Sequence, residues 1–220
     1  MKNTVSFSIE FRPNPYPGKL IVVEGIDGAG KTTQAKEIVK RLNKEGITAS
    51  YTKEPTDMVI GQFIREKILS GNMDIHPLAL QYLFNADRVM HMEKVEGLLK
   101  KGMIIVMDRY FWSSVAYAMA DLEGVTDWYL TAFSVLSFYH QFIVPDMSFF
   151  LEISPEVALK RIEGSGKHTE IYDTVEKLPK IEKNYENLMK QFPDRFTVIH
   201  AERNPEEITQ EIVDLIKKQL

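Results

Sequence analysis

The chain has 220 residues, a net charge of −4 and no cysteine. This length suits one α/β domain, and the missing cysteines exclude disulfides, zinc–thiolate and iron–sulfur sites, and a cysteine nucleophile. A mildly acidic chain is a poor partner for a long polyanion, so we expect no nucleic-acid polymer as a ligand. No apolar run approaches the roughly 18 residues of a membrane span, and we expect a cytoplasmic protein with no membrane contact.

Residues 1–18 form an N-terminal arm ahead of a single domain over residues 19–220. The arm has no hydrophobic signal core, and it carries three prolines and a glycine in the stretch RPNPYPG. This composition is compatible with an ordered arm and equally with a disordered extension.

From residue 19 onward, short apolar segments alternate with segments of helical composition. The expected strands are Lys19–Glu24, Ile47–Lys53, Met103–Met107, Met147–Ile153 and Arg195–His200. The expected helices are Thr32–Glu45, Met58–Leu69, Pro77–Lys101, Ser113–Ala120, Trp128–Phe142, Pro155–Ile162, Val175–Gln191 and Pro205–Leu220. The alternation predicts a three-layer α/β fold, in which helices cover both faces of a five-stranded parallel sheet. Such sheets bind ligands beyond the carboxyl ends of their strands, so we expect functional residues directly after strands.

The glycine-rich stretch Gly25–Thr32 matches the pattern G-x-x-x-x-G-K-[ST] between an expected strand and an expected helix. Its glycines let backbone N–H groups converge on phosphate oxygens, and the helix N-terminus adds a favourable dipole. Lys31 supplies a mobile positive charge for the β- and γ-phosphates, and Thr32 an oxygen for Mg²⁺. The stretch predicts a nucleoside triphosphate site that comprises Gly25, Ile26, Asp27, Gly28, Ala29, Gly30, Lys31, Thr32 and the following Thr33. No Asn-Lys-x-Asp guanine-reading element is present, which argues against a GTPase.

The third expected strand ends in a second charged pair, Asp108 and Arg109. A carboxylate and a guanidinium at a strand end suit a metal ion and a phosphate respectively. The alternative interpretation is a surface ion pair without a ligand.

Phe84 and Arg88 lie four residues apart in the stretch LFNADR, and so share a helix face. An aromatic ring and a guanidinium can hold a flat base by stacking and hydrogen bonding. Phe84 alone fits a core position as well, whereas an arginine on an apolar face needs a partner.

Together these segments resemble the thymidylate kinase family, one of the P-loop nucleoside monophosphate kinases. The resemblance runs from about Lys19 to the C-terminus and rests on the motifs GIDGAGKTTQ, KEPT, IGQFIREKIL, LFNADR, DRYFWSSVAY, PDMSFFLEISPEVALKRI and YDTVEKLPKIEKNYENL. It implies a P-loop kinase fold with a short lid at about residues 163–173. It also implies transfer of the ATP γ-phosphoryl group to dTMP, giving dTDP, with Mg²⁺ as cofactor.

The resemblance further implies roles for individual residues. Arg109 would hold the dTMP phosphate, Phe84 would stack on thymine, and Arg88 would hydrogen-bond it. The other expected dTMP contacts are Glu54, Pro55, Arg65, Ser114 and Tyr117. A tyrosine at position 117 would crowd a ribose 2′-OH. Asp27 matches an acidic position near the metal or the sugar, and Thr32 and Asp108 would organise the metal ion.

Two positions depart from the family pattern. Many bacterial members carry a base-contacting glutamine where this chain has Ala118. The expected lid, EGSGKHTEIYD, contains Lys167 but no arginine. Lys167 is then a candidate catalytic cation or a solvated loop residue, and Arg161 just before the lid is a candidate ATP contact in its place.

Three expectations stay open at this stage. Ala118 leaves room for a P-loop kinase of another deoxynucleoside or its monophosphate. A P-loop ATP-binding switch without a small acceptor is the alternative of a different class, which Arg109, Phe84 and Arg88 argue against. The family is usually homodimeric, and the apolar segment 128–142 with parts of 77–95 would supply the interface or, alternatively, a helix buried in the monomer.

Overall fold

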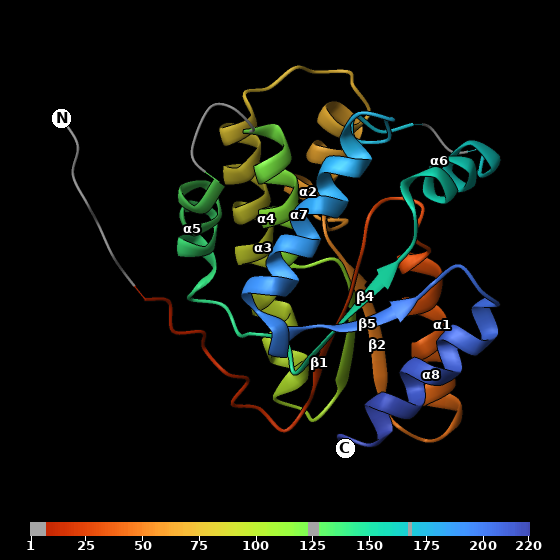
Figure 1. Ribbon diagram of the computed structural model, residues 1–220. Helices are drawn as coiled ribbons and strands as arrows, with labels where there is room; N and C mark the ends of the chain where they lie inside the picture. Colours follow the sequence, from red (N-terminus) through yellow and green to blue (C-terminus); the bar gives the residue numbers. More distant parts are fainter. Residues whose placement is uncertain (1–7, 123–127, 167–168) are drawn as a thin grey trace.

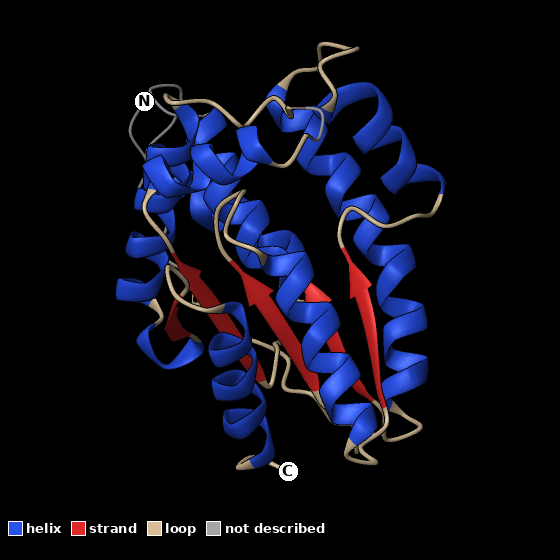
Figure 2. Cartoon of the chain, turned by 90° about the vertical axis from the view of Figure 1, so that its right-hand side faces the viewer, coloured by secondary structure: helices blue, strands red, loops and turns tan. Residues whose placement is uncertain are grey.

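The computed structural model describes residues 8–122, 128–166 and 169–220, and its central element is a five-stranded sheet (Figures 1 and 2). The strands are β1 (Leu20–Glu24), β2 (Ala49–Lys53), β3 (Ile104–Asp108), β4 (Met147–Glu152) and β5 (Thr197–His200). All are parallel, in the order β2-β3-β1-β4-β5. The predicted α/β class is confirmed. β1 and β3 are buried along their whole length, as strands covered on both faces must be.

Helices cover both faces of the sheet (Figure 1). On one side lie α1 (Lys31–Lys44) and α8 (Pro205–Lys217). On the other side lie α3 (Pro77–Leu99), α4 (Phe111–Asp121) and α7 (Lys177–Gln191), with α5 (Trp128–Tyr139) packed outside α4. The shorter α6 (Pro155–Gly164) lies near the carboxyl ends of the strands. Nearly every residue of α4 is buried, because the helix is enclosed by α3, α5 and α7.

Several boundaries differ from the sequence-based expectation. The segment Met58–Leu69 is not one α-helix: α2 (Val59–Phe63) continues into a π-helical turn, η1 (Ile64–Leu69). Residues of ordinary helix propensity give no sign of this wider turn. The last strand begins at Thr197, because a 3₁₀ turn, η2 (Pro193–Arg195), precedes it.

Residues 8–18 pack along the outside of the domain. The Phe11 ring lies among the rings of Phe111, Trp112 and Phe192, with centroids 5.8 to 6.0 Å apart. Arg12 pairs with Ile143 through an isolated parallel bridge and donates from Nη1 to Glu96 at 3.0 Å. The arm therefore ties α4 to the ends of α3 and α7.

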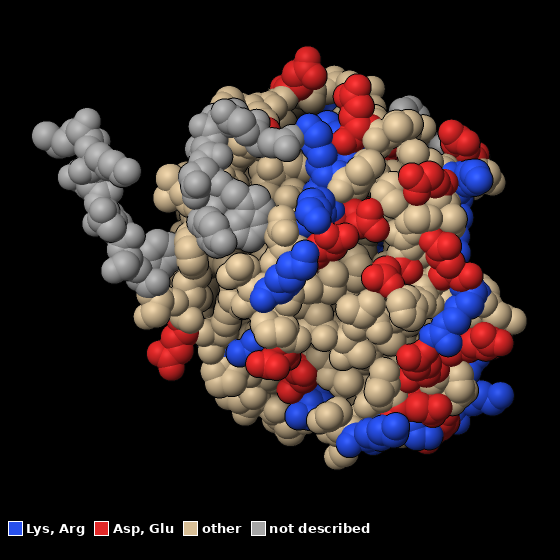
Figure 3. Space-filling view, in the orientation of Figure 1, with Lys and Arg blue, Asp and Glu red and all other residues tan. Residues whose placement is uncertain are grey.

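Charged side chains of both signs are interspersed over the right and lower parts of the face in Figure 3. Within the described part of the chain, no helix is long and apolar enough to cross a membrane.

Candidate active site

A cavity of about 490 Å³ lies at the carboxyl ends of β1, β2 and β3. Most residues expected in the site line it: Asp27, Gly28, Gly30, Lys31, Thr32, Thr33, Glu54, Pro55, Arg65, Phe84, Arg88, Asp108, Arg109, Ser114, Tyr117 and Arg161. The cavity volume suits a small organic ligand. One space thus joins the residues expected at the triphosphate with those expected at the acceptor.

Three residues of the glycine-rich loop do not line the cavity. The side chains of Ile26 and Ala29 are 1% and 2% exposed, because they fold into the core and anchor the loop. Gly25 turns its carbonyl toward Arg109, whose Nη1 donates to it at 3.3 Å. Any contact of Ile26 or Ala29 with a phosphate would be through the backbone. Lys167 lies outside the described residues.

Glycine is required where the loop meets α6. Gly28 has a φ of +81°, and a Cβ atom there would lie 2.5 Å from the carbonyl oxygen of Ala158. Gly30 has a φ of +89° and directly precedes the first residue of α1. The loop therefore follows a left-handed path that other residues adopt only with strain, and it ends at a helix N-terminus that favours anions.

Lys31 is buried, and its ammonium group donates to the carbonyl oxygen of Ile26 at 2.6 Å. The nitrogen also lies 3.8 Å from Asp27 Oδ1. Burial lowers the pKa of Lys31, and the positive charge of Arg109 lowers it further against the opposing effect of nearby carboxylates. An anion in the cavity would stabilise the charged ammonium.

Thr32 and Asp108 meet across the β1–β3 edge of the cavity. The Thr32 hydroxyl donates to Asp108 Oδ2. Asp108 Oδ1 is buried and has no hydrogen-bond partner in the described part of the chain. The same part contains no group of three or more His, Cys, Asp or Glu side chains that could hold a metal by themselves. The Thr32 hydroxyl oxygen and Asp108 Oδ1 thus fit Mg²⁺, which is usually bound by one or two protein oxygens, phosphates and water.

Arg109 has a φ of +68°, which is uncommon for a residue with a side chain. Its guanidinium forms an ion pair with Asp27, donates to Ser113 Oγ at 3.2 Å and lies 4.9 Å from the ring centre of Tyr117. Tyr117 OH donates to Asp27 Oδ2 at 2.7 Å. Burial would raise the pKa of Asp27, but the charges of Arg109 and Lys31 outweigh it and set the pKa at about 2.

Behind Arg109 lies a buried group that the sequence analysis missed. Glu24 accepts from Ser113 Oγ at 2.5 Å, from Tyr185 OH at 2.9 Å and from the backbone N–H of Tyr110 at 3.1 Å. Burial raises the pKa of Glu24 in spite of these bonds. The sequence feature that could have indicated Glu24 is a carboxylate at the end of an otherwise apolar strand.

On the acceptor side, Arg88 is 2% exposed and paired with Glu54, whose Oε2 lies 2.5 Å from Arg88 Nη2. Arg88 Nη2 also donates to Ser114 Oγ at 3.0 Å. Phe84 is only partly buried and lines the cavity. Arg65 lines it too, and donates from Nη2 to Asp57 at 2.7 Å. An arginine and an aromatic ring therefore face the same space, as the stretch LFNADR predicts.

Residues 161–165 and 170–173 contribute side chains to one side of the cavity. Arg161 lines it, and its Nη2 donates to the carbonyl oxygen of Ala201 at 2.9 Å. Sequence reasoning missed Glu170 and Tyr172, which also line it. The Tyr172 ring meets that of Tyr117 edge-on, with centroids 4.8 Å apart. These residues follow no strand, so the strand-end rule could not find them.

The cavity brings the glycine-rich loop and the N-terminus of α1 together with the acceptor-side residues Phe84, Arg88 and Arg109. On a parallel sheet of this order, that combination defines the P-loop kinases that phosphorylate nucleotides. Comparison with known proteins gives the family. A sequence model described as thymidylate kinase matches residues 23–212, and the chain belongs to the thymidylate kinase family. Its activity is that of an ATP-dependent nucleoside monophosphate kinase, thymidylate kinase.

Relatives over most of the chain support the assignment. A probable thymidylate kinase of Thermococcus gammatolerans is 35% identical over 214 residues, which cover 92% of this chain and 98% of that protein. One of Methanococcus maripaludis is 41% identical over 178 residues, 81% of each chain. A solved thymidylate kinase structure from Candida albicans, 22% identical, covers 92% of both chains with a TM-score of 0.78 and supports the fold.

Proposed function

We propose that this chain transfers the γ-phosphoryl group of ATP to dTMP in the cavity at the strand ends, giving dTDP and ADP. The observation that carries the proposal is that one cavity is lined both by the phosphate cradle and by Phe84, Arg88 and Arg109. Phosphoryl transfer needs positioning and charge stabilisation more than acid–base chemistry, and these residues supply both. The transfer is direct and in line, with no covalent enzyme intermediate.

On the donor side, backbone N–H groups of the loop and the N-terminus of α1 bind the ATP phosphates. Lys31 exchanges its bond to the Ile26 carbonyl for a phosphate oxygen and stabilises the transferring group. Thr32 and Asp108 would hold Mg²⁺, directly or through water, because Asp108 Oδ1 is a buried acceptor with no protein partner in the described residues. When bound, Mg²⁺ neutralises charge that develops on the phosphate oxygens.

On the acceptor side, Arg109 binds the dTMP phosphate, and its ion pair with Asp27 fixes the guanidinium beside the cradle. Phe84 stacks on thymine while Arg88 and Ser114 contact the edge of the base. Tyr117 crowds the sugar and disfavours a ribose 2′-OH. Glu54, Pro55 and Arg65 shape the turn on this side of the cavity.

The segment at about residues 163–173 acts as a lid. Closure excludes water, which would otherwise hydrolyse ATP. Arg161 supplies a cation from the helix before the lid, with Lys167 as the cation within it.

We also propose a homodimer that forms through α3. Leu78, Tyr82, Val89 and Met90 are apolar, yet 40%, 52%, 49% and 46% exposed. The first three lie near one side of the helix, at i, i+4 and i+11. A second copy of this chain would bury this stripe in a symmetric contact.

A coupled ADP-release assay across dTMP, dUMP, dCMP, dGMP and thymidine tests the function. We expect wild-type protein to favour dTMP, and Lys31→Ala and Arg109→Ala to lower kcat/KM for dTMP by about 100-fold or more while remaining folded. Lys40→Ala, on the exposed side of α1, is the control and keeps full activity. Another preferred acceptor would assign the chain to the wider kinase group, to which Ala118 points. ATP hydrolysis indifferent to every acceptor would indicate a switch.

A further inference from the structure

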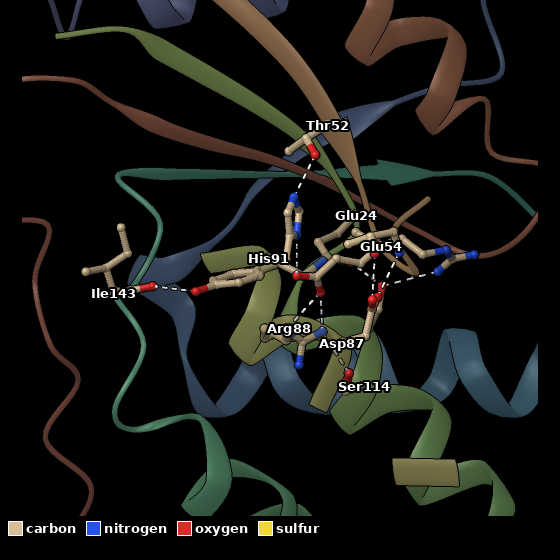
Figure 4. A network of polar contacts seen from close by, with 12 residues as sticks. Glu24, Thr52, Glu54, Asp87, Arg88, His91, Ser114 and Ile143 are labelled. Atoms are coloured by element: carbon tan, nitrogen blue, oxygen red, sulfur yellow. Dashed lines mark hydrogen bonds and ion pairs between the residues drawn. The ribbon is translucent and has the colours of Figure 1, made fainter. Parts of the chain in front are cut away.

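A chain of buried polar contacts runs from β2 to the acceptor pocket through His91 of α3 (Figure 4). His91 is 4% exposed, and its ring lies between Thr52 and Glu54. Thr52 Oγ1 lies 2.6 Å from His91 Nε2, and His91 Nδ1 lies 3.0 Å from Glu54 Oε1. None of the roles proposed above uses this histidine.

The two partners of His91 assign the roles of its ring nitrogens. A carboxylate can only accept, so Nδ1 carries the proton toward Glu54, and Nε2 accepts from the Thr52 hydroxyl. Burial acts to raise the pKa of Glu54, but the charge of Arg88 and the bond from His91 outweigh it and lower the pKa. Glu54 is therefore an ionised carboxylate with one oxygen held by His91.

The other oxygen of Glu54 holds Arg88. Oε2 accepts from Arg88 Nε at 2.7 Å, Arg88 Nη2 also donates to Ser114, and the guanidinium lies 4.4 Å from the ring centre of Tyr139. Arg88 Nη1 is buried and has no hydrogen-bond partner among the described residues, and Arg88 lines the cavity. The N–H groups on Nη1 are thus left for a ligand.

The turn after β2 has a separate anchor. Asp87 accepts from the backbone N–H of Thr56 at 2.8 Å and from its hydroxyl at 2.6 Å. This anchor does not involve His91, so loss of the imidazole would release the Glu54 side chain more than the turn that carries it.

We propose that His91 is a positioning residue for acceptor recognition: its Nδ1–H orients Glu54, which in turn aims Arg88 Nη1 at a carbonyl oxygen on the acceptor base. The proposal rests on the proposed function, because it requires a nucleotide base beside Arg88. A guanidinium only donates, so it favours a base edge with an acceptor oxygen over one with an amino group. His91 therefore contributes to the choice of thymine over cytosine.

Two amide variants separate this role from packing. The amide nitrogen of His91→Asn is bonded to Cγ, as Nδ1 is, and can still donate to Glu54. The amide of His91→Gln extends one bond further, toward the Nε2 position, and loses the contact with Glu54. Both replace a buried ring by a smaller amide, so a purely structural role predicts similar defects in the two variants.

The measurement is kcat and KM for dTMP, dCMP and ATP, with the wild-type protein and His200→Gln, an exposed histidine at the end of β5, as references. We expect His91→Gln to raise KM for dTMP about tenfold or more, since a hydrogen bond to a charged group is lost, and to leave KM for ATP within about twofold. The preference for dTMP over dCMP falls by a similar factor. For His91→Asn, we expect KM for dTMP, KM for ATP and the preference for dTMP over dCMP all to stay within about threefold of the wild-type values.

Equal defects in His91→Asn and His91→Gln would overturn the proposal, as would a wild-type dTMP preference in both. If His91→Gln does not fold, Thr52→Val removes only the hydroxyl that orients the ring; it should raise KM for dTMP about threefold, and an unchanged value would count against the proposal. A wild-type protein without dTMP kinase activity would refute the proposed function as well, whereas an active wild type with unaffected His91 variants refutes only the positioning role.

Discussion

Arg109 is held by its neighbours in an unfavourable backbone conformation. A non-glycine residue at positive φ costs on the order of 1–3 kcal/mol, and here the φ is +68°. The guanidinium is held by Asp27, Ser113 and the Tyr117 ring. In the proposed function, these contacts fix the arginine before a phosphate binds, which lowers the entropy cost of binding the phosphate.

The pairing of Asp27 with Arg109 and Lys31 predicts a specific acid sensitivity. The folded pKa of about 2 lies below the ordinary value of 3.8, so the ion pair stabilises the fold fully above the ordinary pKa, and this stability is lost as pH falls through about 2. The contribution is about 2 kcal/mol. Urea unfolding of wild type and Asp27→Asn should show a difference in the free energy of unfolding that shrinks from about pH 5 toward about pH 2. A difference that is constant over this range would contradict the assignment.

Sequence reasoning could identify the cavity-lining residues of the glycine-rich loop because they belong to one local motif. Lys31 and Thr32 follow from a motif only eight residues long. It did not reach the bond between Arg109 and Asp27, which are 82 positions apart, or the contact of Tyr185 with Glu24, which are 161 apart. Such contacts depend on how the strands and helices assemble, and no local pattern encodes them.

At the scale of elements, the glycine-rich loop and α6 are fitted to each other through Gly28. A Cβ atom at Gly28 would lie 2.9 Å or less from the Cα and carbonyl oxygen of Ala158, and both are backbone atoms that cannot rotate away. The loop is therefore in contact with the helix that leads into the proposed lid.

Gly28→Ala should destabilise the protein more than Gly30→Ala, which is its matched control. Both positions have a left-handed φ, but a Cβ atom at Gly30 meets nothing within 4 Å. We expect Gly30→Ala to cost about 1–2 kcal/mol from backbone strain, and Gly28→Ala a further 1–3 kcal/mol or so from the clash with α6. Urea unfolding measures both. Equal losses of unfolding free energy in the two variants would mean that the loop can move away from α6 at no cost in stability.

The order and type of most helices and strands could be predicted from the sequence, whereas their first and last residues were predicted less accurately. The π-helical turn of η1 and the 3₁₀ turn that delays the start of β5 are departures from regular structure that composition does not record. The same applies to the arm: proline and glycine in residues 12–18 indicate an irregular path, but not that Phe11 would enter an aromatic cluster.

At the scale of the whole molecule, the alternation of strands and helices was enough to predict a parallel three-layer fold. The surface is less predictable. The segment 128–142 and parts of α3 were both candidates for a dimer interface, and the apolar stripe that the structure leaves exposed on α3 consists of Leu78, Tyr82, Val89 and Met90.

This stripe gives a test of the proposed assembly. Val89→Glu places a charge on it and should convert a homodimer into a monomer, because burial of an unpaired charge is costly. Val198→Glu is the matched control, since Val198 is 42% exposed on β5, away from α3. Sedimentation velocity should show twice the mass of the chain for wild type and the control, and the single mass for Val89→Glu. A wild-type monomer would refute the dimer.

The strand order has a mechanical consequence. The loop after β1 carries the donor cradle, and β3 carries Asp108 and leads directly into Arg109; the two strands are hydrogen-bonded neighbours, with Val23 opposite Asp108. In the proposed function, the donor loop and Arg109 thus follow two strands that lie one interstrand step of about 4.8 Å apart, a spacing fixed by backbone hydrogen bonds. This interstrand distance varies little and does not depend on side-chain identity. We therefore expect substitutions of the cavity-lining residues on α3 and α4 to leave this strand spacing unchanged.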